Sequence, residues 1–159
     1  MTDAVFRKNT ISLETGFYHR GLIGLTYSRN KIIGPKSALN LEGTVGWGAS
    51  KGSSQNQFFV LNPQYLLGKE NTFISFGAEL KGYRFTYSGL LGTAQYALAN
   101  GAYQTNTYIG LSGSPTLGIS YYSSNGFTFK AKASIFFIFI DGQLGITLPS
   151  GGFSFGYSF

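Results

Sequence analysis

Six charged residues occupy positions from which their side chains can share one compartment of a β-structure. Three are acids and three are bases: Glu14, Glu42, Glu79, Lys81, Lys130 and Lys132. Residues two apart on a strand point to the same side, and both Glu79/Lys81 and Lys130/Lys132 have this spacing. Charges taken out of water must be paired, because unpaired buried charges are strongly destabilising. The pattern predicts an interior network that plugs the structure, which Asn62 and Gln64 would extend, with a gated ion or solute path as the alternative.

A hydrolytic site would have to use His19, the only histidine of the chain. Nucleophilic hydrolysis requires a histidine close to a serine and an acid. Ser12 and Glu14 share the predicted strand 9–17, but they lie several residues deeper than His19, which falls in the loop that follows the strand. We therefore expect His19 to be an ordinary loop residue and the protein not to be an enzyme. No cluster of His, Cys or acidic residues suggests a metal or cofactor.

The composition indicates alternating surfaces rather than a soluble exterior. Charged residues make up 11% of the 159 residues, with 15 Phe, 11 Tyr, 23 Gly and no Cys, whereas about 25% of a soluble domain is charged. The net charge is +6, but without a dense Lys/Arg run we expect no nucleic-acid partner. No stretch approaches the roughly 20 apolar residues of a membrane helix. Residues 1–3 do not begin a signal peptide, so we expect a mature chain with an initiator Met or a truncated start.

Period-two alternation dominates the chain and predicts a single domain, 1–159, of about eight strands. At the end of the chain, four aromatic residues from Phe153 to Phe159 alternate with Ser154, Gly156 and Ser158. The predicted strands span 9–17, 22–30, 38–49, 58–67, 72–85, 115–123, 127–140 and 151–159. In the fourth strand the alternation is blurred at Phe58 and Val60.

The polar face decides between two kinds of barrel. In a soluble barrel of the lipocalin kind the apolar face points inward and holds a greasy ligand. In a transmembrane barrel the apolar face points outward, and the narrow interior of eight strands is filled by side chains. The polar face here is mainly Ser, Thr, Gly and Asn, which makes a poor soluble surface. We therefore predict an all-β, transmembrane, antiparallel up-and-down β-barrel.

The connections predict which end of the barrel faces outward. Short turns are expected at 31–37, 68–71 and 124–126, the last with an Asn-Gly hairpin signal. The other connections are 18–21, 50–57, 86–114 and 141–150, and three of these four are long. Within 86–114, the alternation over 105–111 predicts an upward extension of the sixth strand. Membrane barrels have short periplasmic turns and longer outer loops, so we expect periplasmic termini.

The final strand resembles the C-terminal recognition strand of bacterial outer-membrane proteins. The residues that carry this resemblance are Phe153, Phe155, Gly156, Tyr157 and Phe159, with an aromatic residue in the last position. Over most of its length the chain is similar to the small eight-stranded outer-membrane β-barrel proteins. Segments 62–71 and 118–130 are similar to a widespread subgroup of them. The resemblance implies insertion by the barrel assembly machinery and residence in the bacterial outer membrane.

The same family contains adhesins, lipid A-modifying enzymes, channels and accessory subunits, so membership does not transfer a function. We predict a structural or interaction role, as an accessory subunit of a larger complex or a surface-contact protein with a plugged lumen. The alternatives are a small channel for ions or hydrophobic solutes and, through His19, a lipid A acyl hydrolase or transferase. Expected partners are outer-membrane lipids and lipopolysaccharide.

Basic residues gather at the expected periplasmic side, where they are expected to anchor the barrel against anionic head groups. They are Arg7, Lys8, Arg29, Lys31, Lys36 and Lys69. Arg20, Lys51 and Arg84 are expected near the outside. Aromatic residues near the predicted strand ends are expected to form girdles at both membrane interfaces; they are Phe17, Tyr27, Trp47, Tyr65, Tyr121, Tyr157 and Phe159.

Overall fold

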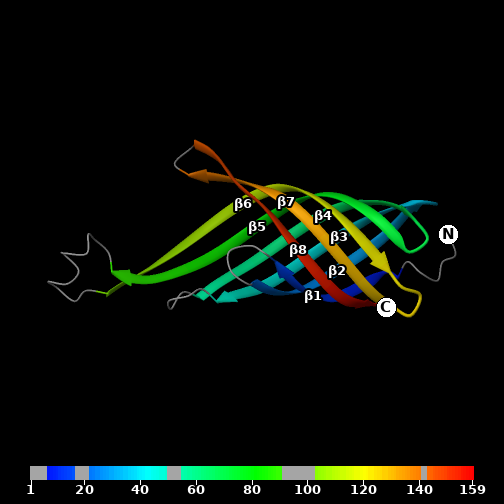
Figure 1. Ribbon diagram of the computed structural model, residues 1–159, viewed down its shortest axis with the longest axis horizontal. Coiled ribbons are helices and arrows are strands. Elements are labelled where there is room, and N and C mark those ends of the chain that lie inside the picture. Colours follow the sequence, from blue (N-terminus) through cyan, green and yellow to red (C-terminus); the bar gives the residue numbers. More distant parts are fainter. Residues whose placement is uncertain (1–6, 17–21, 50–54, 91–102, 141–142) are drawn as a thin grey trace.

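The computed structural model describes residues 7–16, 22–49, 55–90, 103–140 and 143–159. These residues form eight strands: β1 (Asn9–Gly16), β2 (Leu22–Gly34), β3 (Ser37–Ala49), β4 (Gln55–Lys69), β5 (Thr72–Leu90), β6 (Tyr103–Tyr122), β7 (Phe127–Ile140) and β8 (Gln143–Ser158). Each strand pairs antiparallel with the next, and β8 pairs antiparallel with β1 and closes the barrel (Figure 1). The predicted antiparallel up-and-down barrel is confirmed. No helix in the described ranges is long and apolar enough to cross a membrane.

The outer wall of the barrel carries the large apolar side chains. On β3, Leu41 and Trp47 are 55% and 60% exposed, whereas Glu42 and Thr44 between them are each 3% exposed. On β1 the exposed fraction of Leu13 is 61%. A lipocalin-like barrel needs its apolar face inside, so the structure excludes that alternative. A wall of this kind is stable against hydrocarbon, as in transmembrane barrels.

The two ends of the barrel differ (Figure 1). The turns that join β2 to β3, β4 to β5 and β6 to β7 lie at one end, which we call the turn end. The end of the chain lies there too, because the Ser158 amide donates to the Gly126 carbonyl of the β6–β7 turn at 2.7 Å. The start of β1 lies beside it, since the Asn9 and Phe159 backbones exchange hydrogen bonds of 3.1 and 2.9 Å. At the opposite end, which we call the loop end, β1, β3, β5 and β7 finish and β2, β4, β6 and β8 begin. There the β5–β6 and β7–β8 hairpins separate, since β6 and β7 pair only as far as Gly113 and Phe137.

The two longest predicted loops are largely wrong. β5 continues to Leu90 and β6 begins at Tyr103, and these residues are paired, so most of 86–114 is a hairpin. The predicted extension of the sixth strand over 105–111 is confirmed. Most of 141–150 is also strand, because β8 begins at Gln143 opposite Ile140. Backbone pairing satisfies N–H and C=O groups whether or not side chains alternate, so these strands extend beyond the alternating sequence.

The short turns form where the sequence predicts them, but the residues at which they begin and end differ. β2 continues to Gly34, so the predicted turn at 31–37 shrinks to Pro35 and Lys36. In the β6–β7 turn, Gly126 has a φ of 98°. Residues with a side chain rarely adopt this conformation, whereas glycine adopts it readily. The amide of Phe127 donates to the Asn125 side-chain oxygen at 3.2 Å. The Asn-Gly turn is therefore confirmed.

Candidate functional site in the barrel interior

An apolar plug closes the interior at the turn end. It consists of Ala38, Leu66, Phe73 and Tyr122, which are all at most 1% exposed. The rings of Phe73 and Tyr122 meet edge to face, with centroids 5.8 Å apart. This plug is not among the features predicted from the sequence. A signal for it was available, because these residues have the same parity as inward polar residues on their own strands, such as Ser75 and Ser120.

A layer of small polar side chains lies next to the plug. Thr10 and Ser158 share a hydrogen bond of 2.8 Å, which joins β1 to β8 inside the barrel. The side chain of Asn40 donates to that of Asn30 and joins β3 to β2. Such cross-strand bonds satisfy polar groups that water does not reach. The Thr10–Ser158 bond therefore joins the two strands at which the barrel closes, and the Asn40–Asn30 bond joins two further strands of the wall.

An ion pair between Glu42 and Lys130 crosses the lumen. Glu42 lies on β3 and Lys130 on β7, so the pair joins strands that are not neighbours in the sheet. The side-chain amide of Gln64 donates to the second oxygen of Glu42 at 2.8 Å. The Lys130 ammonium also donates to Ser28 at 3.2 Å and lies 5.9 Å from the centre of the Tyr122 ring. This lysine therefore connects the plug to the charged side chains that lie further towards the loop end.

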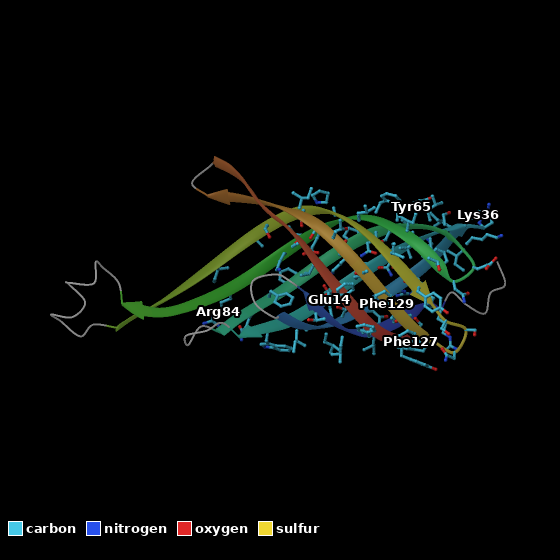
Figure 2. The ribbon with its side chains drawn as sticks, viewed as in Figure 1. Glu14, Lys36, Tyr65, Arg84, Phe127 and Phe129 are labelled. Atoms are coloured by element: carbon cyan, nitrogen blue, oxygen red, sulfur yellow. The ribbon has the colours of Figure 1, made fainter. Side chains whose placement is uncertain are left out.

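Lys132 lies between two carboxylates on different strands. Its ammonium is 2.7 Å from Glu14 and 3.8 Å from Glu79. Glu14 also accepts a hydrogen bond from Thr26 at 3.1 Å. Lys132 reaches Glu14 past β8, where the residue opposite it is Gly152, which has no side chain. Figure 2 shows Glu14 about midway along the barrel.

Lys81 has a different environment from the other predicted network residues. Its side chain points inward, and its ammonium lies 5.0 Å from the centre of the Phe58 ring. Phe58 and Val60 interrupt the alternation of β4 because both side chains lie on the inner face with Asn62. Five of the six predicted residues form two ion-pair groups, Glu42–Lys130 and Glu14–Lys132–Glu79. The ammonium of Lys81 lies over an aromatic ring on the same inner face. Asn62 accepts a hydrogen bond from Thr116 at 3.3 Å.

Little free volume remains between these charges. A cavity of about 10 Å³ lies among them, lined by residues that include Glu14, Glu42, Gln64, Lys130 and Lys132. A cavity of this size has room for about one water molecule. Chemically, the arrangement neutralises and immobilises charge. It does not present an open binding pocket.

The predicted recognition strand places its aromatic side chains on the outer wall. Phe153, Phe155, Tyr157 and Phe159 are all exposed, and Phe155 packs on Phe129 of β7 with ring centroids 5.1 Å apart. Gly156 lies on the inner face. A Cβ atom there would collide with Ser12 and with the Ile11 carbonyl of β1. Glycine is therefore required at this position, where β8 closes against β1.

The structure gives no geometry for the hydrolase alternative. His19 lies outside the described residues, and Ser12 is buried on the inner face, 3% exposed. Among the residues that the structure describes, no group of three or more His, Cys, Asp or Glu side chains could hold a metal ion.

The basic and girdle residues that the structure describes are divided between the two ends. Lys36 and Tyr65 lie towards the turn end and Arg84 towards the loop end (Figure 2). Arg7 donates to the backbone carbonyls of Ser158 at 2.8 Å and Ser124 at 3.2 Å. It thereby ties the chain before β1 to β8 and to the β6–β7 turn. The girdle residues Tyr27, Trp47, Tyr121 and Tyr157 are exposed on the outer wall.

Comparison with known proteins identifies the fold. No protein-family model matches the sequence, and no curated protein matches it significantly. The crystal structure of the N-terminal β-barrel domain of Pseudomonas aeruginosa OprF is similar over 96% of this chain and 99% of its own length, with a TM-score of 0.62 and 14% identity. The structure of neisserial surface protein A is similar over 99% and 98%, with a TM-score of 0.50 and 15% identity. The chain therefore has the fold of the small eight-stranded outer-membrane β-barrels.

Proposed function

We propose that this protein is an integral outer-membrane protein with a closed lumen and a structural or interaction role. The filled interior supports the proposal most strongly. The apolar plug occupies one end, and the Glu42–Lys130 pair crosses the lumen above it. A conduit needs a continuous open path, whereas the cavity among these charges measures about 10 Å³. The interior charges then serve to hold the barrel shut, and the outer surfaces are left to perform the function.

The proposed orientation places the turn end in the periplasm. Short turns face the periplasm in barrels of this kind, and longer loops face outward. The β5–β6 and β7–β8 hairpins would then stand outside the membrane, where they project beyond the rest of the barrel (Figure 1). We propose that 86–114 contacts another protein there, or that the outer wall packs in a larger complex as an accessory subunit. Lipopolysaccharide would surround this end.

Entry into the membrane would follow from β8. Its exposed aromatic face, from Phe153 to Phe159, has the pattern that the barrel assembly machinery is expected to recognise. β8 is also the strand that pairs with β1 to complete the cylinder. We propose that this strand is the assembly signal of the chain.

Planar-bilayer recording tests whether the lumen is closed. The purified protein should produce no discrete conductance steps. The Lys130→Ala and Glu79→Ala variants should be less stable than the wild type, and they too should produce no conductance steps. Regular steps from the wild-type protein that change in size with Lys130→Ala would refute the closed lumen and support the small-channel alternative.

Purification in mild detergent tests the interaction role. A partner should co-purify with the wild-type protein and be lost when residues 91–102 are replaced by a short Gly-Ser linker. Residues 124–126 at the other end offer a matched control, because changes to that turn should leave the partner bound. A lone monomer, together with no phenotype on deletion of the segment, would argue against this role.

A further inference from the structure

A groove with a charged edge lies on the outer wall near the turn end. Its volume is about 590 Å³, and it crosses β2, β3 and β4. The outward side chains that line it are Arg29, Lys31, Leu39, Leu41, Pro63 and Tyr65. The apolar members continue the lipid-facing wall, whereas Arg29 and Lys31 place two cations on it.

The strand register arranges these residues as a cationic edge and an apolar floor. In one row Arg29 pairs with Leu41, which pairs with Pro63, and in the next Lys31 pairs with Leu39, which pairs with Tyr65. Arg29 and Lys31 are two residues apart on β2, so their Cα atoms are separated by about 6–7 Å along the strand. One phosphate group can contact two cations at this separation. The apolar rows begin directly beside that position.

The floor of the groove is low because of Pro63. The β4–β5 ladder is interrupted there, between the Leu61–Leu80 and Gln64–Gly77 pairs. A proline ring projects less than the leucines beside it, and proline cannot donate to a ladder. Tyr65 places an aromatic ring at the side of this depression, and aromatic rings of this kind favour the membrane interface.

The charges at the groove favour an anion. Among the acids that the structure describes, Glu14, Glu42 and Glu79 are engaged in interior ion pairs. Glu70 lies in the β4–β5 turn, 3.6 Å from Lys69. No acidic side chain of the described residues lines the groove, so the two cations attract a negative charge from outside the chain.

We propose that the groove binds an anionic phospholipid, with its phosphate between Arg29 and Lys31 and an acyl chain over Leu39, Leu41, Pro63 and Tyr65. The choice of a phospholipid over a lipid A phosphate rests on the proposed orientation, because the turn end would then lie in the phospholipid leaflet. Each cation near an anionic head group adds to the affinity, and the apolar floor adds contact that an inorganic anion cannot make.

Titration of the purified protein with single lipids tests the site. Native mass spectrometry in a mild detergent would count bound phosphatidylglycerol, with phosphatidylcholine and lipid A titrated in parallel. The wild-type protein should bind phosphatidylglycerol most tightly, and Arg29→Gln/Lys31→Gln should weaken that binding by about 30-fold. Lys36→Gln/Lys69→Gln is the matched control. It removes the same charge from the same end but outside the groove, and should weaken binding by about threefold or less.

Three outcomes would overturn the site: equal binding of phosphatidylcholine, tighter binding of lipid A, or equal losses in the two double variants. Circular dichroism of each variant excludes unfolding as the cause of a loss. The lipid titration does not depend on whether the lumen conducts. An open channel with intact phosphatidylglycerol binding would therefore refute the closed lumen alone.

Discussion

At the scale of single residues, the interior charges are stable because each has a partner within reach. Breaking a buried ion pair by removing one partner costs about 3–5 kcal/mol, because the other charge is left unpaired. Replacing both partners by well-packed apolar residues of similar volume often changes the stability little. The Glu42–Lys130 pair is the clearest case, since both side chains are almost completely buried.

We therefore expect Lys130→Met to lower the free energy of unfolding by about 3–5 kcal/mol. The double variant Glu42→Gln/Lys130→Met should recover at least half of that loss, because it leaves no unpaired charge. Urea unfolding in lipid vesicles, followed by tryptophan fluorescence from Trp47, measures both values. A double variant less stable than Lys130→Met would show that the pair is not the source of the effect.

Gly156 gives a second prediction at this scale. Alanine at Gly156 would place a Cβ atom against Ser12 and the Ile11 backbone, so it should destabilise the barrel by about 1–3 kcal/mol. Gly43 on β3 is the control, because a Cβ atom there would lie 4.0 Å from Leu61. Equal unfolding midpoints for Gly156→Ala and Gly43→Ala would contradict the tight closure of β8 on β1.

The inward position of each charge is predictable from the sequence, but its partner is not. Parity along a strand assigns Glu42 and Lys130 to the inner face. Which residues meet across the lumen depends on the stagger of the strands around the barrel, and no local pattern records that stagger. The apolar plug was not predicted for a different reason. Its members point inward by the same parity, but their apolar character resembles that of the outer wall.

At the scale of the strands, the alternation in the sequence and the pairing in the structure do not end at the same residues. β5 alternates clearly from the turn end to about Phe85, but its pairing with β6 continues to Leu90 opposite Tyr103. Outside hydrocarbon, either face of a hairpin can be polar, so the sequence loses its period while the backbone ladder persists. The fourth, fifth and eighth predicted strands are therefore too short at the loop end, whereas the second, third and seventh have the predicted bounds there.

The outer wall yields a prediction about depth along one strand. Leu117 lies on the outer face of β6, five residues before the strand ends at Tyr122, and is 55% exposed, whereas Tyr121 lies next to that end. Lysine at Leu117 should cost about 2–4 kcal/mol, and lysine at Tyr121 about 0–1 kcal/mol. Folding titrations in vesicles measure the two values, and equal costs would mean that β6 does not cross the bilayer as proposed.

At the scale of the whole molecule, the charges are sorted by location. The described acids are inside the barrel, except for Glu70 in a turn. The described bases are divided between the interior, which holds Lys81, Lys130 and Lys132, and the exterior, where Arg29, Lys31 and Lys36 lie at the turn end. A membrane surface that contains anionic lipid would attract that end. The distribution supports the proposed orientation, with the cationic end towards the periplasmic leaflet and the projecting hairpins on the far side.

The central claim is that apolar side chains face lipid and polar ones fill the interior, and single cysteines test it most directly. The chain has no cysteine of its own, so one thiol can be placed at each of Leu39, Asn40, Thr44 and Val45 on β3 and labelled with a fluorophore. In vesicles that carry a lipid-attached quencher, the labels at Leu39 and Val45 should be quenched strongly and those at Asn40 and Thr44 weakly. Stronger quenching at Asn40 and Thr44 than at Leu39 and Val45 would contradict the account.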